Sequence, residues 1–387
     1  MLNLTFEAMR ENRPGRTWQT AFRRHWPGWK AWYLSHRDHD APSLAESERA
    51  LARYMPEFVS TWQRLADLAR GDEEAARFLT FWCPPAYLSH CSQAVLLDEE
   101  GPVLVRNYDL DPRLNEATML HSAWKGRRVI GSMEAIAGLA DGVNDRGLAL
   151  SLTFGGRRVV GRGFGIPLIL RYILEVCEDT GEAIEVLRHT PSHMAYNVTL
   201  LDRQGNHATV LVAPDRPTIV TRDLAVTNHQ LRVEWPEQAK FSRTAERKRY
   251  LDHLLAQPGL TPADLEEAFL MPPLFSRNYA RGFGTVYTAA YRPLEGSVTL
   301  RWPDQAPWRQ SFREFTEGHR RVCYKGHATD GAADAARRLR EQFEALSAEE
   351  FRYLPAGFAE ALLQGIKGGR AEDWQRFARL WNPGCCG

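Results

Sequence analysis

Apolar residues in the first part of the chain recur at the three- and four-residue spacing of amphipathic helices. Between residues 43 and 82 they stand at Leu44, Leu51, Tyr54, Met55, Phe58, Trp62, Leu65 and Leu68. Ser43, with Glu46 three residues later, predicts a capping box at the start of this pattern. Pro56 interrupts it, which favours two helices over one, and residues 73–81 predict a third.

The pattern changes near residue 90 to short apolar runs separated by turn residues, which is typical of strands. Strands are expected at residues 91–97, 103–108, 128–134, 135–139, 148–154, 198–202, 207–212, 218–227, 285–291 and 296–302, and helices at 168–178, 181–188, 242–255 and 262–269. The remaining C-terminal segment reads as helical and charged. Hairpins with helices grouped between them predict an α+β layered domain rather than a doubly wound parallel sheet. A domain boundary is expected near residue 90.

Composition and charge narrow the class of protein. The 387 residues are 44% hydrophobic and 25% charged, which are ordinary values for a globular chain with a sizeable core. A formal net charge of +1 gives no overall basic field for nucleic acid or an anionic membrane. Residues 1–18 carry charges where a signal peptide would be apolar, and no apolar run approaches the roughly 20 residues of a spanning helix. We therefore expect a soluble, cytoplasmic protein with no nucleic-acid or membrane partner.

The cysteines and glycines show no recognisable cofactor or metal motif. The six cysteines, at 83, 91, 177, 323, 385 and 386, lack paired CxxC units and are expected to be free thiols unless one is catalytic. Cys385 and Cys386 read as a tail, with a redox or metal site as the alternative. The Gly-rich residues 155–167 match neither a dinucleotide fingerprint nor a phosphate loop, and favour a flexible connection. We expect no cofactor and no metal.

The predicted hairpin around residues 99–100 brings reactive side chains together. Its register places Cys91 opposite residues 108 and 109, close to Arg106 and Asp109. A guanidinium favours the thiolate, which is the nucleophilic form, and an aspartate can hold an ammonium group. A strict strand sends Arg106 and Asp109 to opposite faces, so Asp109 is expected past the regular strand or after a bulge. The alternative is a small buried Cys91 beside a surface ion pair.

Three downstream segments supply further polar candidates. Asn144 lies in a predicted turn over residues 141–148 that opens a strand, and Asn228 follows the end of another strand. Arg247 lies at the start of a predicted helix. Taken singly, these segments are equally typical of a hairpin turn, a strand end and a solvated helix face.

Together, these motifs resemble a known family. The order Cys91, RNYD, DGVNDRGL, TN and TAERKRYL is similar to the choloylglycine hydrolase and penicillin V acylase group. It resembles more closely the acyl-coenzyme A:6-aminopenicillanate acyltransferase-like branch, peptidase family C45, over roughly residues 85–300. These are N-terminal-nucleophile (Ntn) hydrolases. The resemblance implies an αββα sandwich over residues 91–387 with a helical C-terminal extension, preceded by a helical prosegment over residues 1–90.

The resemblance also implies roles for six residues. Self-cleavage between His90 and Cys91 would free an α-amine that serves as general base, and the Cys91 thiolate would form a thioester with an acyl group. The implied site consists of Cys91 as nucleophile, Arg106 tuning the thiol, Asp109 orienting the α-amine, Asn144 by its backbone and Asn228 by its side chain in the oxyanion hole, and Arg247 bracing the site.

The implied activity is that of an amidase or N-acyltransferase acting on linear amide bonds. The expected partners are a small N-acyl amide or an acyl donor, with acyl-coenzyme A among the candidates. The branch usually has glycine before the nucleophile, where this chain has His90, and glycine eases the tight turn that cleavage needs. The alternative is therefore an unprocessed, non-catalytic scaffold that binds an acyl or amide ligand.

Overall fold

The structure is a computed structural model that describes residues 2–36, 41–279 and 282–325. Its largest sheet has nine strands, and every neighbouring pair is antiparallel except β1 and β4, which run parallel. In spatial order the strands are β10 (Ile219–Thr221), β9 (His207–Val212), β8 (Tyr196–Asp202), β7 (Leu148–Phe154), β6 (Gly138–Asn144), β5 (Val129–Glu134), β4 (Thr118–Ser122), β1 (Leu2–Glu11) and β16 (Gly318–Tyr324).

A second sheet packs against the first. In spatial order its strands are β11 (Ala225–Val226), β2 (His90–Leu96), β3 (Val103–Leu110), β13 (Phe283–Arg292), β14 (Ser297–Arg301) and β15 (Trp308–Ser311), with β12 (Arg277–Asn278) pairing to β13. Buried polar contacts join the two inner faces. Gln93 on β2 donates to Thr199 on β8 at 2.6 Å and accepts from Ser151 on β7 at 2.5 Å.

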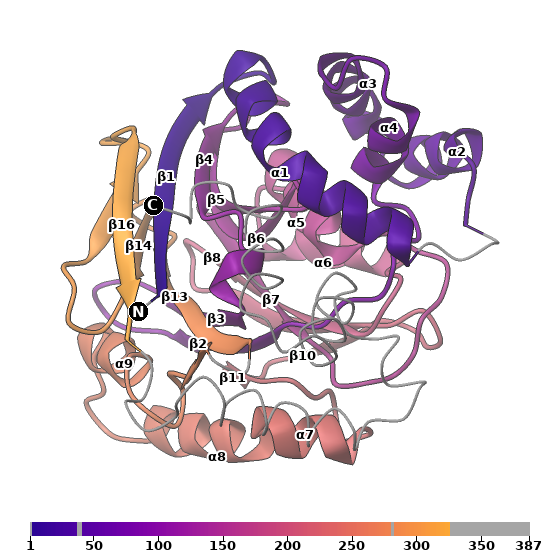
Figure 1. Ribbon diagram of the computed structural model, residues 1–387. Coiled ribbons are helices and arrows are strands. Elements are labelled where there is room, and N and C mark those ends of the chain that lie inside the picture. Colours follow the sequence, from indigo (N-terminus) through magenta and orange to yellow (C-terminus); the bar gives the residue numbers. More distant parts are fainter. Residues whose placement is uncertain (1, 37–40, 280–281, 326–387) are drawn as a thin grey trace, which may run out of the picture.

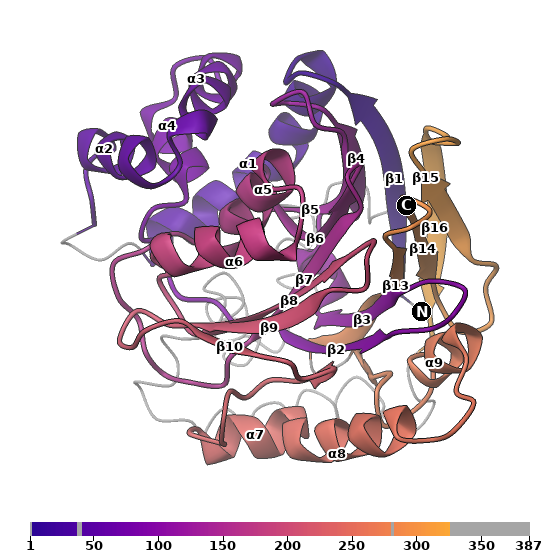
Figure 2. The same cartoon turned by 180° about the vertical axis from the view of Figure 1, so that it is seen from behind.

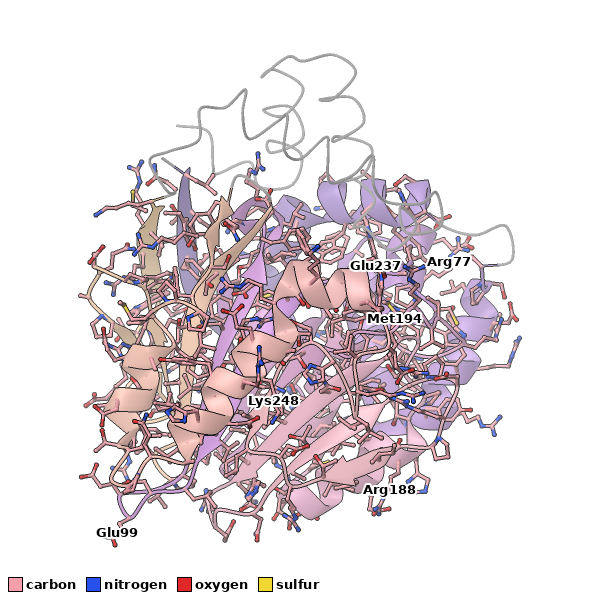
Figure 3. The ribbon with its side chains drawn as sticks, turned by 90° about the horizontal axis from the view of Figure 1, so that it is seen from below. Arg77, Glu99, Arg188, Met194, Glu237 and Lys248 are labelled. Atoms are coloured by element: carbon pink, nitrogen blue, oxygen red, sulfur yellow. The ribbon has the colours of Figure 1, made fainter. Side chains whose placement is uncertain are left out.

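Helices cover both outer faces, which completes four layers (Figures 1 and 2). Helices α5 (Ile166–Val176) and α6 (Thr180–His189) pack on the nine-stranded sheet. Helices α7 (Pro236–Ser242), α8 (Thr244–Leu255) and α9 (Pro262–Ala268) lie on the outer side of the second sheet. Figure 3 views this layer from below, with Glu237 on α7 and Lys248 on α8. The predicted αββα sandwich is confirmed.

The segment before Cys91 is not wholly helical, contrary to the prediction. Strand β1 lies between β4 and β16, with Leu4, Phe6 and Met9 buried. Sequence reasoning missed it because the partners of β1 are distant in the chain: Leu2 pairs with Tyr324, and Glu7 with Thr118. The first residues are therefore part of the main sheet.

The rest of this segment is helical, as predicted. Its helices are α1 (Arg16–Ser35), α2 (Leu44–Tyr54), α3 (Val59–Leu68) and α4 (Glu73–Thr80), with a 3₁₀ turn at Pro56–Phe58. The capping box of Ser43 and Glu46 is present, and Pro56 separates α2 from α3. Helix α1 presents a row of buried aromatic side chains, in which Trp18 stacks on Phe22 and Phe22 on Trp26. The helical segment thus contributes to the main core.

Two predicted elements differ in the structure. Residues 135–137, predicted as part of a short strand, form a tight turn, and β6 covers 138–144. Of the turn predicted at 141–148, only residues 145–147 form one, just before β7. A Cβ at Gly142 would lie 2.7 Å from Leu174 on α5, so glycine here permits close packing rather than a turn. The strand expected at 218–227 is divided between β10 and β11, because the chain crosses there from one sheet to the other.

The chain after β14 contains two strands where a helical segment was predicted. Residues 308–311 and 318–324 are the strands β15 and β16, not helix. The rest of the predicted helical extension, with Cys385 and Cys386, lies outside the described residues. No helix in the described ranges is long and apolar enough to cross a membrane.

Candidate active site

Cys91 lies on β2 with its thiol on the face shared by Tyr108 and Arg106 of β3. The register pairs Cys91 with Tyr108, as the hairpin prediction requires. Because side chains alternate along a strand, Arg106 projects on the same face as Tyr108. The Arg106 guanidinium donates to Cys91 Sγ at 3.1 Å, and both residues are fully buried. The predicted contact between thiol and guanidinium is confirmed.

A buried carboxylate holds Arg106 in place. Asp141 on β6 accepts from the guanidinium at 2.7 Å, and neither side chain is exposed to solvent. The carbonyl of Ala140 accepts a second bond at 2.7 Å. The hydroxyls of Tyr287 and Tyr291 on β13 also donate to Asp141. Asp141, on the nine-stranded sheet, thus joins the two sheets through its bonds to Arg106 and to the tyrosines of the second sheet. The sequence had predicted that Asp141 lies in a turn.

Burial and charge act against each other on the thiol. Burial raises the pKa of Cys91 to about 11, although the Arg106 guanidinium opposes this change. Burial also disfavours the charge of Arg106, but the nearby Cys91 and Asp141 outweigh it and raise the Arg106 pKa. In the intact chain Cys91 is therefore a protonated thiol at neutral pH, next to a cation that favours the thiolate.

Asn228 and Arg247 hold the backbone of Cys91. Asn228 follows β11, and its Oδ1 accepts from the Cys91 backbone N–H at 3.1 Å. Arg247, near the start of α8, donates to the Cys91 carbonyl at 2.5 Å and to Asn228 Oδ1 at 2.7 Å. Asn228 Nδ2 donates weakly to the carbonyls of Ser89 and Phe154, at 3.5 and 3.3 Å. The structure therefore brings both predicted residues to Cys91.

Asp109 occupies a different place from the predicted one. It lies within the regular strand β3, opposite His90, and therefore on the face away from Arg106. Thr285 donates to its carboxylate at 2.7 Å. Burial raises the pKa of Asp109 to about 6, against the opposing charge of Arg247. The regular pairing of β3 with β2, without a bulge, already brings Asp109 next to the His90–Cys91 junction.

Asn144 lies apart from this group, so the prediction that it stands at the nucleophile is wrong. It ends β6 three residues beyond Asp141, which corresponds to about 10 Å along a strand. Its amide donates to the carbonyls of Leu174 and Cys177, and its Oδ1 accepts from two N–H groups in the following turn. Asn144 ties the end of α5 to the β6–β7 turn.

The Gly-rich loop packs closely against the site through a glycine, and its arginines pair with acidic residues outside the site. A Cβ on Gly156, which has φ of +67°, would lie 2.4 Å from the Asn228 carbonyl, so only glycine fits beside this residue. The loop arginines form ion pairs elsewhere: Arg157 with Asp215 and Glu234, Arg158 with Glu237, and Arg162 with Glu46. Within the described ranges, no group of three or more His, Cys, Asp or Glu could hold a metal.

Cavities lie on both sides of the His90–Cys91 junction. One of about 160 Å³ is bordered by His90, Asp109, Arg243 and Arg247. The His90 ring stacks on Phe283 there, and burial lowers its pKa to about 3. The other cavity lies on the thiol side and is bordered by Ser89 and Tyr108. We call it the thiol-side chamber; its free volume is about 40 Å³, room for only a few water molecules.

The thiol-side chamber is covered by the chain that precedes the junction. Trp29 and Trp32 of α1 form one wall, and Tyr87, Leu88 and Ser89 form another. The last three belong to residues 84–89, an irregular stretch between the helices and β2 that we call the connector. In the intact chain, therefore, no acyl group can reach Cys91 Sγ from this side.

Two buried carboxyls in the thiol-side chamber predict a pH-dependent stability. Burial raises the pKa of Glu116 and of Glu134 from 4.5 to about 7. Between pH 4.5 and 7 the folded chain keeps protons that the unfolded chain loses, so the free energy of unfolding falls as pH rises. The fall is on the order of 3 kcal/mol for each carboxyl.

Urea unfolding at several pH values measures this effect. Glu116→Gln should flatten the decline and leave the protein more stable than wild type at pH 8. Glu99→Gln, at the exposed tip of the β2–β3 hairpin (Figure 3), should leave the profile unchanged. Equal pH profiles for wild type and Glu116→Gln would contradict the assignment.

The chain is similar in sequence to one known protein family. The family described as acyl-coenzyme A:6-aminopenicillanic acid acyl-transferase matches residues 96–307, more than half of the chain, and Cys91 lies just before this range. No curated protein matches the chain.

Several solved structures are similar at low identity. A mutant conjugated bile acid hydrolase from Clostridium perfringens is 13% identical, with 61% of this chain and 97% of that chain covered and a TM-score of 0.39. Penicillin V acylase from Agrobacterium tumefaciens is 12% identical, with coverage of 60% and 90% and a TM-score of 0.41. The Caenorhabditis elegans ortholog of N-acylethanolamine-hydrolyzing acid amidase is 16% identical, with coverage of 56% and 99% and a TM-score of 0.41.

Proposed function

Because this chain belongs to the acyl-coenzyme A:6-aminopenicillanic acid acyl-transferase family, we propose that it is a cysteine amidase or N-acyltransferase. It acts on linear amide bonds of a small N-acyl substrate, through a thioester on Cys91, after the chain cuts itself between His90 and Cys91. The observation that carries this proposal is the Arg106 guanidinium 3.1 Å from a thiol whose backbone is held by Asn228 and Arg247.

The first step is self-cleavage. Cys91 Sγ attacks the carbonyl carbon of His90, the C–N bond breaks, and the thiol proton ends on the released α-amine of Cys91. Water then hydrolyses the thioester and leaves a carboxylate on His90. The Asn228 Nδ2, which donates to the Ser89 carbonyl in the intact chain, is freed when the connector withdraws.

The second step is turnover of an external substrate. The free α-amine, with an ordinary pKa of roughly 7.7–8.0, takes the thiol proton at neutral pH. Sγ attacks the substrate carbonyl, and Asn228 Nδ2 donates to the developing oxyanion. The amine leaves with the proton, and water or an acceptor amine resolves the thioester. Asp109, beside the junction, orients the α-amine, and Arg247 keeps Asn228 in place.

Intact-mass measurement of the purified protein tests the proposal. We expect two fragments, one ending at His90 and one beginning at Cys91. Incubation with N-acyl amides or acyl-coenzyme A should then add an acyl group to the second fragment, and hydroxylamine should remove it. A chain that stays full length, gains no acyl group and still binds N-acyl amides would overturn the proposal and favour the non-catalytic scaffold.

We expect the two fragments to stay associated after the cut, because β1 pairs with β4 and β16 inside the main sheet. They should elute together in size-exclusion chromatography and separate in guanidinium. Phe6→Asp, which buries a charge on β1, should release the first fragment or prevent folding, whereas Thr5→Asp on the exposed face should not. Separation of the wild-type fragments in native buffer would contradict this expectation.

A further inference from the structure

The thiol-side chamber contains polar groups that the proposed chemistry does not use. Two of its lining residues adjoin Cys91: Tyr108 pairs with Cys91 across the strands, and Ser89 Oγ lies 3.9 Å from Cys91 Sγ. Its other walls are mostly apolar and include Trp29, Trp32 and Met133. The exceptions are Asn115 and two carboxyls, Glu116 and Glu134, which are only 4% and 8% exposed.

Glu116 uses only one of its oxygens in the fold. Its Oε1 accepts from the backbone N–H of Ile136 at 2.9 Å and from the Trp29 indole at 2.8 Å. The first bond holds a turn in which Ile136 has φ of +63°, an unfavourable conformation for a β-branched residue. Glu116 Oε2 has no hydrogen-bond partner although it is buried. A glutamine would serve the turn equally well, so the second oxygen of a carboxylate requires another explanation.

Glu134 is placed similarly, at the end of β5. Its Oε2 accepts from the Tyr108 hydroxyl at 2.8 Å. Within the described ranges, neither Glu134 nor Glu116 forms a salt bridge with a lysine or arginine. A buried carboxyl without a cation either stays protonated or is unfavourable as an anion. A pair of them beside one chamber is suited to a ligand that brings its own positive charge.

We propose that the chamber binds the acyl part of the substrate, and that this part carries an ammonium group which donates to Glu116 and Glu134. The substrate class is thus an aminoacyl amide with an apolar or aromatic body, rather than a simple fatty or aryl-acyl amide. The Trp29 indole, an apolar ring whose N–H reaches Glu116, shows the kind of donor that this position accepts. The inference rests on the proposed function, because the acyl group enters only after the connector has moved.

Matched pairs of coumarin amides test this substrate class. The phenylglycyl amide is compared with the phenylacetyl amide, and the 6-aminohexanoyl amide with the hexanoyl amide, on processed enzyme. In at least one pair, kcat/KM should favour the ammonium-bearing member by about ten- to a hundredfold, the effect of a charge-assisted hydrogen bond. Equal values in both pairs, or a preference for the neutral members, would overturn the inference.

Two variants locate the effect. Glu116→Gln keeps the acceptor for Ile136, and either Glu116→Gln or Glu134→Gln should bring the ratio within the preferred pair close to one. Glu57→Gln, a carboxyl that also accepts from a tyrosine but lies outside the chamber, should keep the wild-type ratio. Circular dichroism checks that each variant is folded. A wild-type ratio in both chamber variants would refute the assignment.

Calorimetry separates this inference from the proposed function. The measurement uses protein cut after His90, because the connector covers the chamber in the intact chain. If this cut protein turns over no amide and Cys91 gains no acyl group, the proposed function has failed. Binding of phenylglycinamide to the protein, with no binding of phenylacetamide, would still support an ammonium site in the chamber. Equal binding of the two compounds, or binding of neither, would overturn it.

Discussion

Cys91→Ala should leave the chain uncut and reduce the rate of amide turnover at least a thousandfold. Loss of the nucleophile reduces the rates of other hydrolases by about this factor or more. Without Sγ no thioester forms at His90, so no α-amine is released to act as base. Intact-mass analysis should show only the full-length chain, and acyl donors should add no mass. The protein should remain folded, because alanine replaces a buried cysteine with little loss of volume.

Two further variants serve as controls. Cys83→Ala removes a half-buried thiol eight residues upstream and should change neither cleavage nor turnover. Cys91→Ser keeps a nucleophile without a readily ionised thiol, so cleavage should be slower than in the wild type rather than absent. Cleavage or acylation that survives in Cys91→Ala would show that the nucleophile lies elsewhere.

Asp141→Ala should lower the free energy of unfolding by about 3–5 kcal/mol, because it leaves the Arg106 charge buried without its partner. Asp141→Asn should lower it less, since the amide oxygen still accepts from the guanidinium. Both variants should slow alkylation of Cys91 by iodoacetamide in processed enzyme and move its pH dependence upward, because a displaced Arg106 no longer favours the thiolate. Urea unfolding and alkylation rates between pH 6 and 10 measure the two effects.

Asp145→Asn is the matched control for this prediction. Asp145 lies four residues further along and forms an ion pair with Arg128, whose side chain is half exposed. Loss of such a pair should change stability by less than about 1 kcal/mol and leave alkylation of Cys91 unchanged. If Asp141→Asn has wild-type stability and a wild-type alkylation profile, Asp141 does not position Arg106.

The part of the site that follows from local pairing could be predicted from the sequence. The β2–β3 turn fixes the register that places Tyr108 opposite Cys91, and the strand alternation then brings Arg106 to the thiol. No rule of local strand pairing predicts the positions of Asn228 and Arg247. They were reached only through the resemblance to a family, because the contacts that bring them to Cys91 join distant segments.

The parts that were missed depend on tertiary contacts. The Ala-Asp-Gly segment at 140–142 is typical of a turn, yet it lies in a central strand because Arg106 and two tyrosines satisfy the aspartate. Asn144 was assigned to the oxyanion hole through the family resemblance, but its side chain holds the end of α5 instead. Asp109 was expected beyond the regular strand because its position on the opposite face seemed to exclude it from the junction. It borders the junction from that face instead.

The pairing of β1 with β16 sets an order of events during synthesis. β1 is made well before its neighbour β16, which follows only after nearly all the described chain, since Leu2 pairs with Tyr324. Contacts between such distant segments form late in folding. A cut at residue 90 before that point would turn an intramolecular pairing into an encounter between two separate chains. The proposed cleavage is therefore best timed after β16 has been made and paired with β1, and a truncated chain lacking β16 would be a poor substrate for it.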